Sequence, residues 1–85
     1  MGEADDWAPA APCGYLTKAA QARGEKVEFV VYPGAVHDFD HPRLDVKERD
    51  NIAYSASGTG KATVGTNPAA RADALKRVDA FLRAP

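Results

Sequence analysis

The stretch VEFVVYPGAVHDFDHP, residues 27–42, decides how this chain can fold. Its first six residues are β-branched or aromatic except for Glu28, which predicts a strand buried on both faces over residues 27–32. Pro33 and Gly34 then interrupt the run, and His37 follows three residues later. Because α/β proteins place their chemistry just past the ends of such strands, His37 is the first candidate functional residue.

A helix is predicted on each side of this stretch. Residues 1–9 predict a loop, and residues 10–24 a helix with prolines in its first turn and Gly24 as its terminator. Residues 67–83 predict a second helix, with Asn67 as the N-cap, Pro68 in the first position and an apolar stripe. Two pairs of opposite charge at i,i+4 spacing support it, Asp73 with Arg77 and Asp79 with Arg83.

The segment between strand and second helix, residues 33–66, is long, polar and rich in turn residues. We expect it to form the loop that carries His37 and then an excursion from the domain. Within the excursion, residues 51–54 and 61–65 could pair as a surface hairpin. A strand buried on both faces needs parallel neighbours, and no comparable run precedes the first helix. The order loop, helix, strand, long loop, helix therefore predicts an α/β fold whose sheet is incomplete in this chain.

Composition excludes several classes of protein. The 85 residues allow at most one small domain, and large apolar residues are few, with three Phe, one Trp and one Met. Cys13 is the single cysteine, which excludes an internal disulfide, and two histidines with one cysteine cannot form a zinc finger. A net charge of −1 gives no sign of the excess positive charge that binding to nucleic acid or an anionic membrane surface requires. The absence of a membrane span or signal pattern predicts a soluble, cytoplasmic chain, although Met1 is expected to lie inside a larger unit.

Two acidic residues, Asp5 and Asp6, lie just before the helix that leads into the predicted strand. In a parallel layout, one right-handed crossover brings this acid loop and His37 to the same edge of the sheet. An Asp that accepts a hydrogen bond from an imidazole fixes its tautomer and stabilises the imidazolium formed when the histidine takes a proton. The order acid, then histidine, is the one found in α/β-hydrolases, where the nucleophile comes earlier.

Three motifs carry a resemblance to a known family. Residues 2–9, GEADDWAP, resemble the acid-loop pattern G-x-x-D-x-x-x-P of the dienelactone hydrolase family, and residues 32–39, YPGAVHDF, resemble its histidine-loop pattern Y-P-G-A-x-H-x-F. The closing helix from Asn67 is also similar to the way members end. The resemblance implies the C-terminal portion of an α/β-hydrolase fold and hydrolysis of a small ester or lactone without cofactor or metal. It makes Asp5 the orienting acid, with Asp6 as the alternative, and His37 the general base.

The nucleophile of that family has no counterpart in this sequence. Its elbow, G-x-C-x-G or G-x-S-x-G, is missing, because Cys13 and Ser57 lack the flanking glycines and both follow Asp5. We therefore expect a C-terminal fragment that needs the N-terminal part of the fold and is inactive alone, since the oxyanion donors around the elbow are missing too.

Three other features of the sequence have interpretations of their own. His37, Asp38, Asp40 and His41 could form a small metal-binding or interaction module, although the neighbouring prolines argue against the helix that would align the histidines. Trp7, beside the acid loop, could line a substrate pocket or simply pack. Residues 58–63, GTGKAT, only partly match a phosphate loop, because Ala62 stands where Ser or Thr is required.

Overall fold

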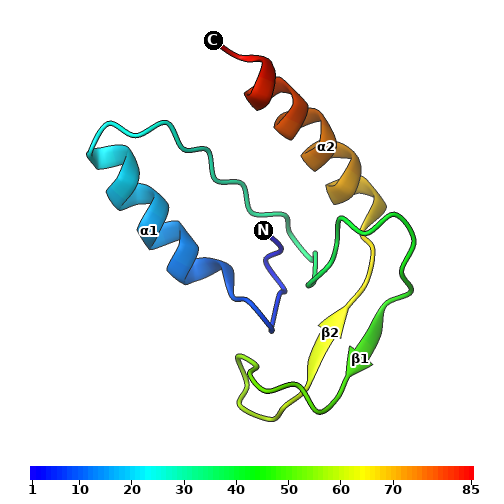
Figure 1. Ribbon diagram of the computed structural model, residues 1–85. Helices are drawn as coiled ribbons and strands as arrows, with labels where there is room; N and C mark the ends of the chain where they lie inside the picture. The colour runs from blue at the N-terminus through cyan, green and yellow to red at the C-terminus, as the bar shows by residue number, and fades with distance from the viewer.

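The computed structural model describes all 85 residues and contains two helices and one two-stranded sheet (Figure 1). The elements are α1 (Ala10–Ala22), β1 (Lys47–Arg49), β2 (Ala62–Val64) and α2 (Pro68–Arg83). Residues 25–31 run from the end of α1 back to the centre of the molecule without helix or strand. The order of elements matches the prediction except at this central segment.

Both helices begin and end where local chemistry places them. α1 follows Pro9 and ends next to Gly24, whose φ of 85° lies in the left-handed region that glycine adopts without strain. α2 follows Asn67, whose side chain accepts a hydrogen bond from the amide of Ala70, and Pro68 occupies its first turn. The structure thus sets the helices at 10–22 and 68–83, against predicted ranges of 10–24 and 67–83.

Residues 27–32, predicted as a buried strand, are paired only at their end. Gly2 and Tyr32 form an isolated parallel bridge, in which the Tyr32 amide donates to Met1 and the Glu3 amide donates to Tyr32, both at 2.9 Å. The expectation that the chain holds no parallel neighbour is therefore wrong for residues 1–3. The Met1 amine also donates to the carbonyl of Val30 at 2.7 Å, and residues 25–31 form no strand.

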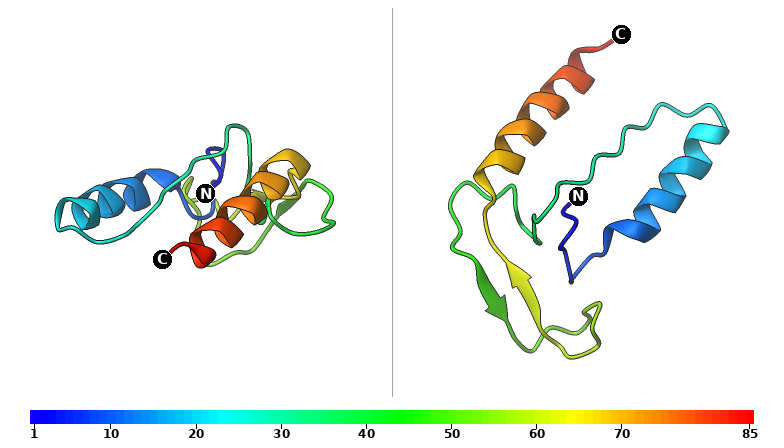
Figure 2. Two further views of the ribbon diagram at one scale, coloured as in Figure 1. Left: turned by 90° about the horizontal axis from the view of Figure 1, so that it is seen from above. Right: turned by 180° about the vertical axis from the view of Figure 1, so that it is seen from behind.

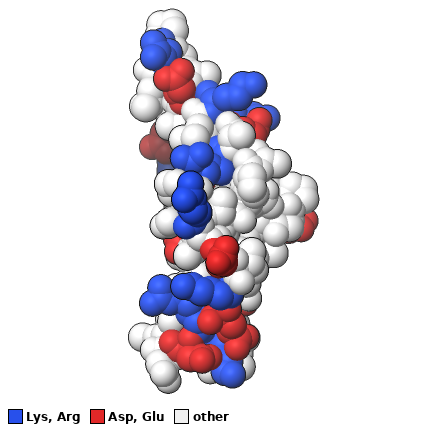
Figure 3. All heavy atoms as spheres, turned by 90° about the vertical axis from the view of Figure 1, so that its right-hand side faces the viewer, with Lys and Arg blue, Asp and Glu red and all other residues white.

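The first strand of the hairpin lies earlier in the sequence than predicted, nearer to the histidine loop. β1 and β2 pair antiparallel, with Lys47 opposite Val64 and Arg49 opposite Ala62. The second arm matches the predicted 61–65, but the first arm, predicted at 51–54, is wrong. Asn51 has a φ of 57°, a left-handed conformation that interrupts a strand, so residue 51 belongs to the connection instead. Charges of both signs alternate on the face that includes this hairpin (Figure 3).

The core is very small and central. Eight of 85 residues are buried, and Val64 is the largest fully buried side chain. The two helices lie apart in every view (Figures 1 and 2). The radius of gyration of 14.2 Å exceeds the roughly 12 Å expected for a compact chain of this length. The structure is therefore a partial α/β arrangement gathered around one well-packed corner.

Candidate active site

A tight turn directs the histidine loop back toward the acid loop. The amide of Ala35 donates to the carbonyl of Tyr32 at 3.3 Å, and Gly34, third in this turn, has a φ of 71°. A type II turn requires a positive φ at its third residue, which favours glycine there, and proline is common at its second. Beyond the turn, His37 forms a parallel bridge with Val64, and its carbonyl accepts from the Gly65 amide at 3.1 Å. The backbone of His37 is thereby fixed against β2.

The acid loop packs backbone to backbone against the histidine loop. The amide of Ala4 donates to the carbonyl of Ala35 at 2.9 Å, and Ala35 is fully buried. A Cβ atom on Gly2 would lie 2.3 Å from that same carbonyl oxygen, so only glycine fits this position. We call residues 1–9 together with residues 32–39 the acid–histidine corner.

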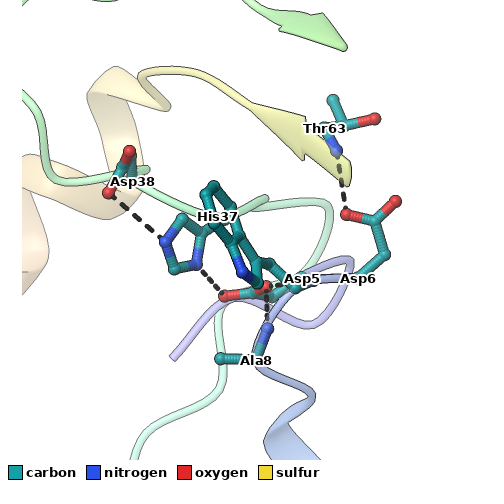
Figure 4. Close-up of polar contacts among 7 residues, drawn as sticks. Asp5, Asp6, Ala8, His37, Asp38 and Thr63 are labelled. Carbon is teal, nitrogen blue, oxygen red and sulfur yellow. Dashed lines mark hydrogen bonds and ion pairs between the residues drawn. The ribbon is translucent and has the colours of Figure 1, made fainter. Parts of the chain in front are cut away.

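Asp5 and His37 meet at the centre of this corner (Figure 4). His37 Nδ1 lies 3.1 Å from Asp5 Oδ2, and the Asp5 side chain is only 8% exposed. The other oxygen of Asp5 accepts from the amides of Trp7 at 2.9 Å and Ala8 at 2.7 Å. Both carboxylate oxygens are therefore occupied, which removes the carboxylate's freedom to turn away from the imidazole.

This arrangement settles what each imidazole nitrogen can do. An ionised carboxylate only accepts hydrogen bonds, so the contact with Asp5 assigns the proton to Nδ1. Nε2 of the neutral ring is then left with its lone pair and can accept a proton. A proton taken by Nε2 creates an imidazolium beside the buried Asp5 charge, which stabilises it.

Asp38 is a second carboxylate beside the imidazole, on the Nε2 side. Its Oδ1 lies 3.7 Å from Nε2, beyond hydrogen-bonding distance, so the two form an ion pair only when His37 is protonated on both nitrogens. The Asp38 side chain is about half exposed and its backbone has a φ of 64°, which is uncommon for any residue except glycine. Sequence reasoning placed Asp38 in a possible metal cluster and missed this contact.

Asp6, the alternative acid, serves a different part of the molecule. Its Oδ1 accepts from the Thr63 amide in β2 at 2.9 Å (Figure 4). Its carbonyl accepts from the Ala56 amide at 2.8 Å. The structure therefore brings Asp5, and not Asp6, to His37. Sequence analysis also missed the amides of Trp7 and Ala8, although an Asp shortly before a helix commonly binds amides two and three residues later.

The remaining candidate residues lie outside the corner. His41 Nδ1 accepts from the backbone amide of Arg43, and no group of three or more His, Cys, Asp or Glu residues is arranged to hold a metal ion. Cys13 is half-buried in α1, and the Ser57 hydroxyl bonds to Ser55 and Thr59 in the hairpin loop. Neither Cys13 nor Ser57 makes a hydrogen bond with His37, so neither stands in position as a nucleophile.

A groove of about 490 Å³ lies between the central segment and α2, away from the acid–histidine pair. Its apolar lining includes Val27, Phe29, Val78 and Phe81, and neither Asp5 nor His37 reaches it. Helix α2 is tied to the corner beside this groove, because the Tyr32 hydroxyl donates to Asp73 at 2.8 Å. The groove is thus an unfilled space between elements rather than part of the acid–histidine site.

A comparison with protein families assigns this chain to one of them. A model of the dienelactone hydrolase family matches residues 1–84. The chain belongs to the dienelactone hydrolase family. Neither a curated protein nor a solved structure matches it. The resemblance drawn from the acid and histidine motifs is confirmed. The family has the α/β-hydrolase fold, and the two helices and two-stranded sheet of this chain form a small, incomplete α/β arrangement. Neither helix has the length and apolar character needed to cross a membrane.

Proposed function

We propose that this member of the dienelactone hydrolase family supplies two parts of a Ser- or Cys-His-Asp triad that hydrolyses a small carboxylic ester or lactone. Asp5 is the orienting acid and His37 is the general base. The observation that carries the proposal is the 3.1 Å contact from Nδ1 of His37 to a carboxylate whose other oxygen is held by two amides. That contact leaves Nε2 as the proton acceptor.

Each step assigns a role to these two residues. A serine hydroxyl or cysteine thiol gives its proton to Nε2 and attacks the carbonyl carbon, and the proton on Nε2 then passes to the departing alkoxide. Water enters, loses a proton to Nε2 and attacks the acyl intermediate, and Nε2 then returns that proton to the departing serine or cysteine, which releases the acid and restores the nucleophile. Asp5 stays ionised throughout, because its role is to hold the ring and stabilise the imidazolium.

The attacking atom comes from outside these 85 residues in this proposal. The sequence lacks the G-x-[SC]-x-G elbow, and the structure holds no serine or cysteine bonded to His37. The partner is then the polypeptide that completes the sheet and carries the elbow with its oxyanion-binding amides. The chain alone has a base with nothing to deprotonate, and we expect it to be inactive.

Hydrolysis of p-nitrophenyl acetate tests the proposal in two forms of the protein. We expect the 85-residue chain to give no turnover above that of free imidazole. The coding sequence upstream of Met1 is expected to encode an in-frame G-x-[SC]-x-G, and the product that includes it is expected to hydrolyse the ester. In that product His37→Ala should lower kcat by roughly 10⁶-fold and Asp5→Asn by roughly 10⁴-fold, as in other triads.

His41→Ala is the matched control, since His41 is the only other histidine and its ring bonds only to a neighbouring amide. It should leave kcat unchanged. Turnover by the chain alone that disappears in His37→Ala, with no added polypeptide, would show that the nucleophile is not missing. An upstream sequence without the elbow would count equally against the proposal.

A further inference from the structure

Trp7 contacts both members of the acid–histidine pair. Its backbone amide donates to Asp5 Oδ1 at 2.9 Å, and its indole ring lies against the imidazole of His37. The two ring centroids are 4.7 Å apart and the ring planes are inclined by 36°. This separation lies in the range of favourable aromatic contacts. One residue therefore reaches the acid through its main chain and the base through its side chain.

The imidazole ring of His37 is only partly enclosed, so a contact with the Trp7 ring can decide its orientation. Asp5 meets Nδ1, Asp38 lies on the Nε2 side, and the side chain is still 30% exposed. The last torsion of histidine is broad and roughly two-fold, so a ring flip would present a different edge to Asp5. On the Nδ1 side, the hydrogen bond of 3.1 Å to Asp5 also opposes this flip.

We propose that Trp7 is a positioning residue for the acid–histidine pair. Its amide holds the Asp5 carboxylate, and its indole holds the imidazole in the orientation that directs Nδ1 at that carboxylate and Nε2 away from it. The indole also suits the charged form of the ring, because the face of tryptophan attracts a cation within about 6 Å. This inference deepens the proposed function and rests on the roles assigned there to Asp5 and His37.

Nuclear magnetic resonance of the histidine rings tests the inference directly in the 85-residue chain. The chain has two histidines, so His41 provides an internal reference. An indole stacked on His37 should shift its ring protons upfield relative to those of His41, and ¹⁵N shifts should show the Nδ1–H tautomer at His37. Trp7→Leu should remove the upfield shift and lower the ratio of Nδ1–H to Nε2–H tautomer several-fold.

Two further variants separate positioning from folding. Trp7→Phe keeps an aromatic ring, so it should retain the tautomer and part of the upfield shift even where Trp7→Leu destabilises the chain. Tyr15→Leu removes an aromatic ring that is 74% exposed on α1, and should change neither signal. Coincident ring resonances of His37 and His41 in both the unaltered chain and the longer product would overturn the inference, as would a folded Trp7→Leu variant with the original tautomer ratio.

The outcome is distinguishable from a failure of the proposed function, because the measurement involves neither ester nor nucleophile. A normal signature at His37 in a longer product that hydrolyses no ester would reject the triad and leave the placement by Trp7 intact. An active product in which Trp7→Leu changes neither the tautomer nor kcat would reject the inference alone.

Discussion

The acid–histidine corner and the two helices differ in how their positions are determined. In the corner, backbone groups bond directly to one another across the two loops, and Ala35 at its centre has no exposed surface. On the helices, large apolar side chains face solvent, with Leu75 54%, Leu82 75% and Leu16 67% exposed. The corner is thus specified by short-range contacts that the chain contains, whereas the apolar helix faces find no partner within it.

The largest expected loss of stability comes from replacing a glycine of the corner with alanine, and the same change in α1 provides the comparison. Gly2→Ala places a methyl group 2.3 Å from the Ala35 carbonyl oxygen, and backbone on both sides has little room to move. We expect a loss of about 1–3 kcal/mol or more in stability, as for an overpacked core, with loss of the His37 tautomer preference. Thermal unfolding and the histidine ring spectra measure the two effects.

Gly14→Ala is the matched control in α1. The added methyl group would lie 3.3 Å from the ring edge of Phe29, which can shift, and alanine favours a helix over glycine by roughly 0.5–1 kcal/mol. It should therefore leave the corner spectra unchanged and be neutral or slightly stabilising. Equal losses from both variants would mean that the corner is no more tightly constrained than α1.

The same contrast explains what could be predicted from the sequence. Proline, glycine and asparagine at helix ends act within a few residues, so the bounds of α1 and α2 followed from local signals such as Asn67 and Gly24. The order of elements along the chain was enough to predict that His37 lies close to Asp5 or Asp6. Fold topology brings loops together, and the two motifs that resemble the acid and histidine loops of the family predicted the same pairing.

Other features depend on distances that sequence patterns do not contain. Asp5 and Asp6 are adjacent and chemically identical, and only the direction of each side chain decides which meets His37. Residues 27–32 have the composition of a strand, but a strand also needs a neighbour to pair with. In this structure only residues 1–3 pair with them, through one bridge. The first hairpin arm was misplaced because a left-handed Asn51 cannot be distinguished from a strand residue by alternation.

A smaller effect is expected from shortening apolar side chains in the two regions. Val64 is fully buried beside His37, and Val64→Ala removes two methyl groups, which should lower stability by about 1.6 kcal/mol through transfer alone. Leu82→Ala removes more apolar volume from α2, yet Leu82 is 75% exposed and the change should stay within about 0.5 kcal/mol. Chemical denaturation compares the two. A larger loss for Leu82→Ala would show that α2 is covered in solution.

The smallest effect concerns the one polar link between α2 and the corner. Asp73 accepts from Arg77 Nε at 2.6 Å and from the Tyr32 hydroxyl at 2.8 Å, and these two hydrogen bonds, that of Arg77 foremost, lower the pKa of Asp73 below its ordinary value of 3.8. Burial, followed by the hydrogen bond to Asp73 and the charge of that carboxylate, raises the pKa of Tyr32 above its ordinary value of 10.0.

The signs of these two shifts define a window of pH in which the link holds. A lowered pKa at Asp73 adds stability above about pH 3.8, which is lost as the pH falls through the folded-state value. A raised pKa at Tyr32 adds stability below about pH 10, which is lost as the pH rises through its folded-state value. Asp73→Asn should flatten the acidic limb of a plot of melting temperature against pH and reduce the alkaline limb only in part, because burial still raises the pKa of Tyr32. Asp79→Asn breaks a similar i,i+4 pair, with Arg83 at 2.9 Å and no tyrosine, so it should leave the alkaline limb intact. An alkaline limb that Asp73→Asn leaves unchanged would mean that the Asp73 carboxylate does not act on the Tyr32 hydroxyl.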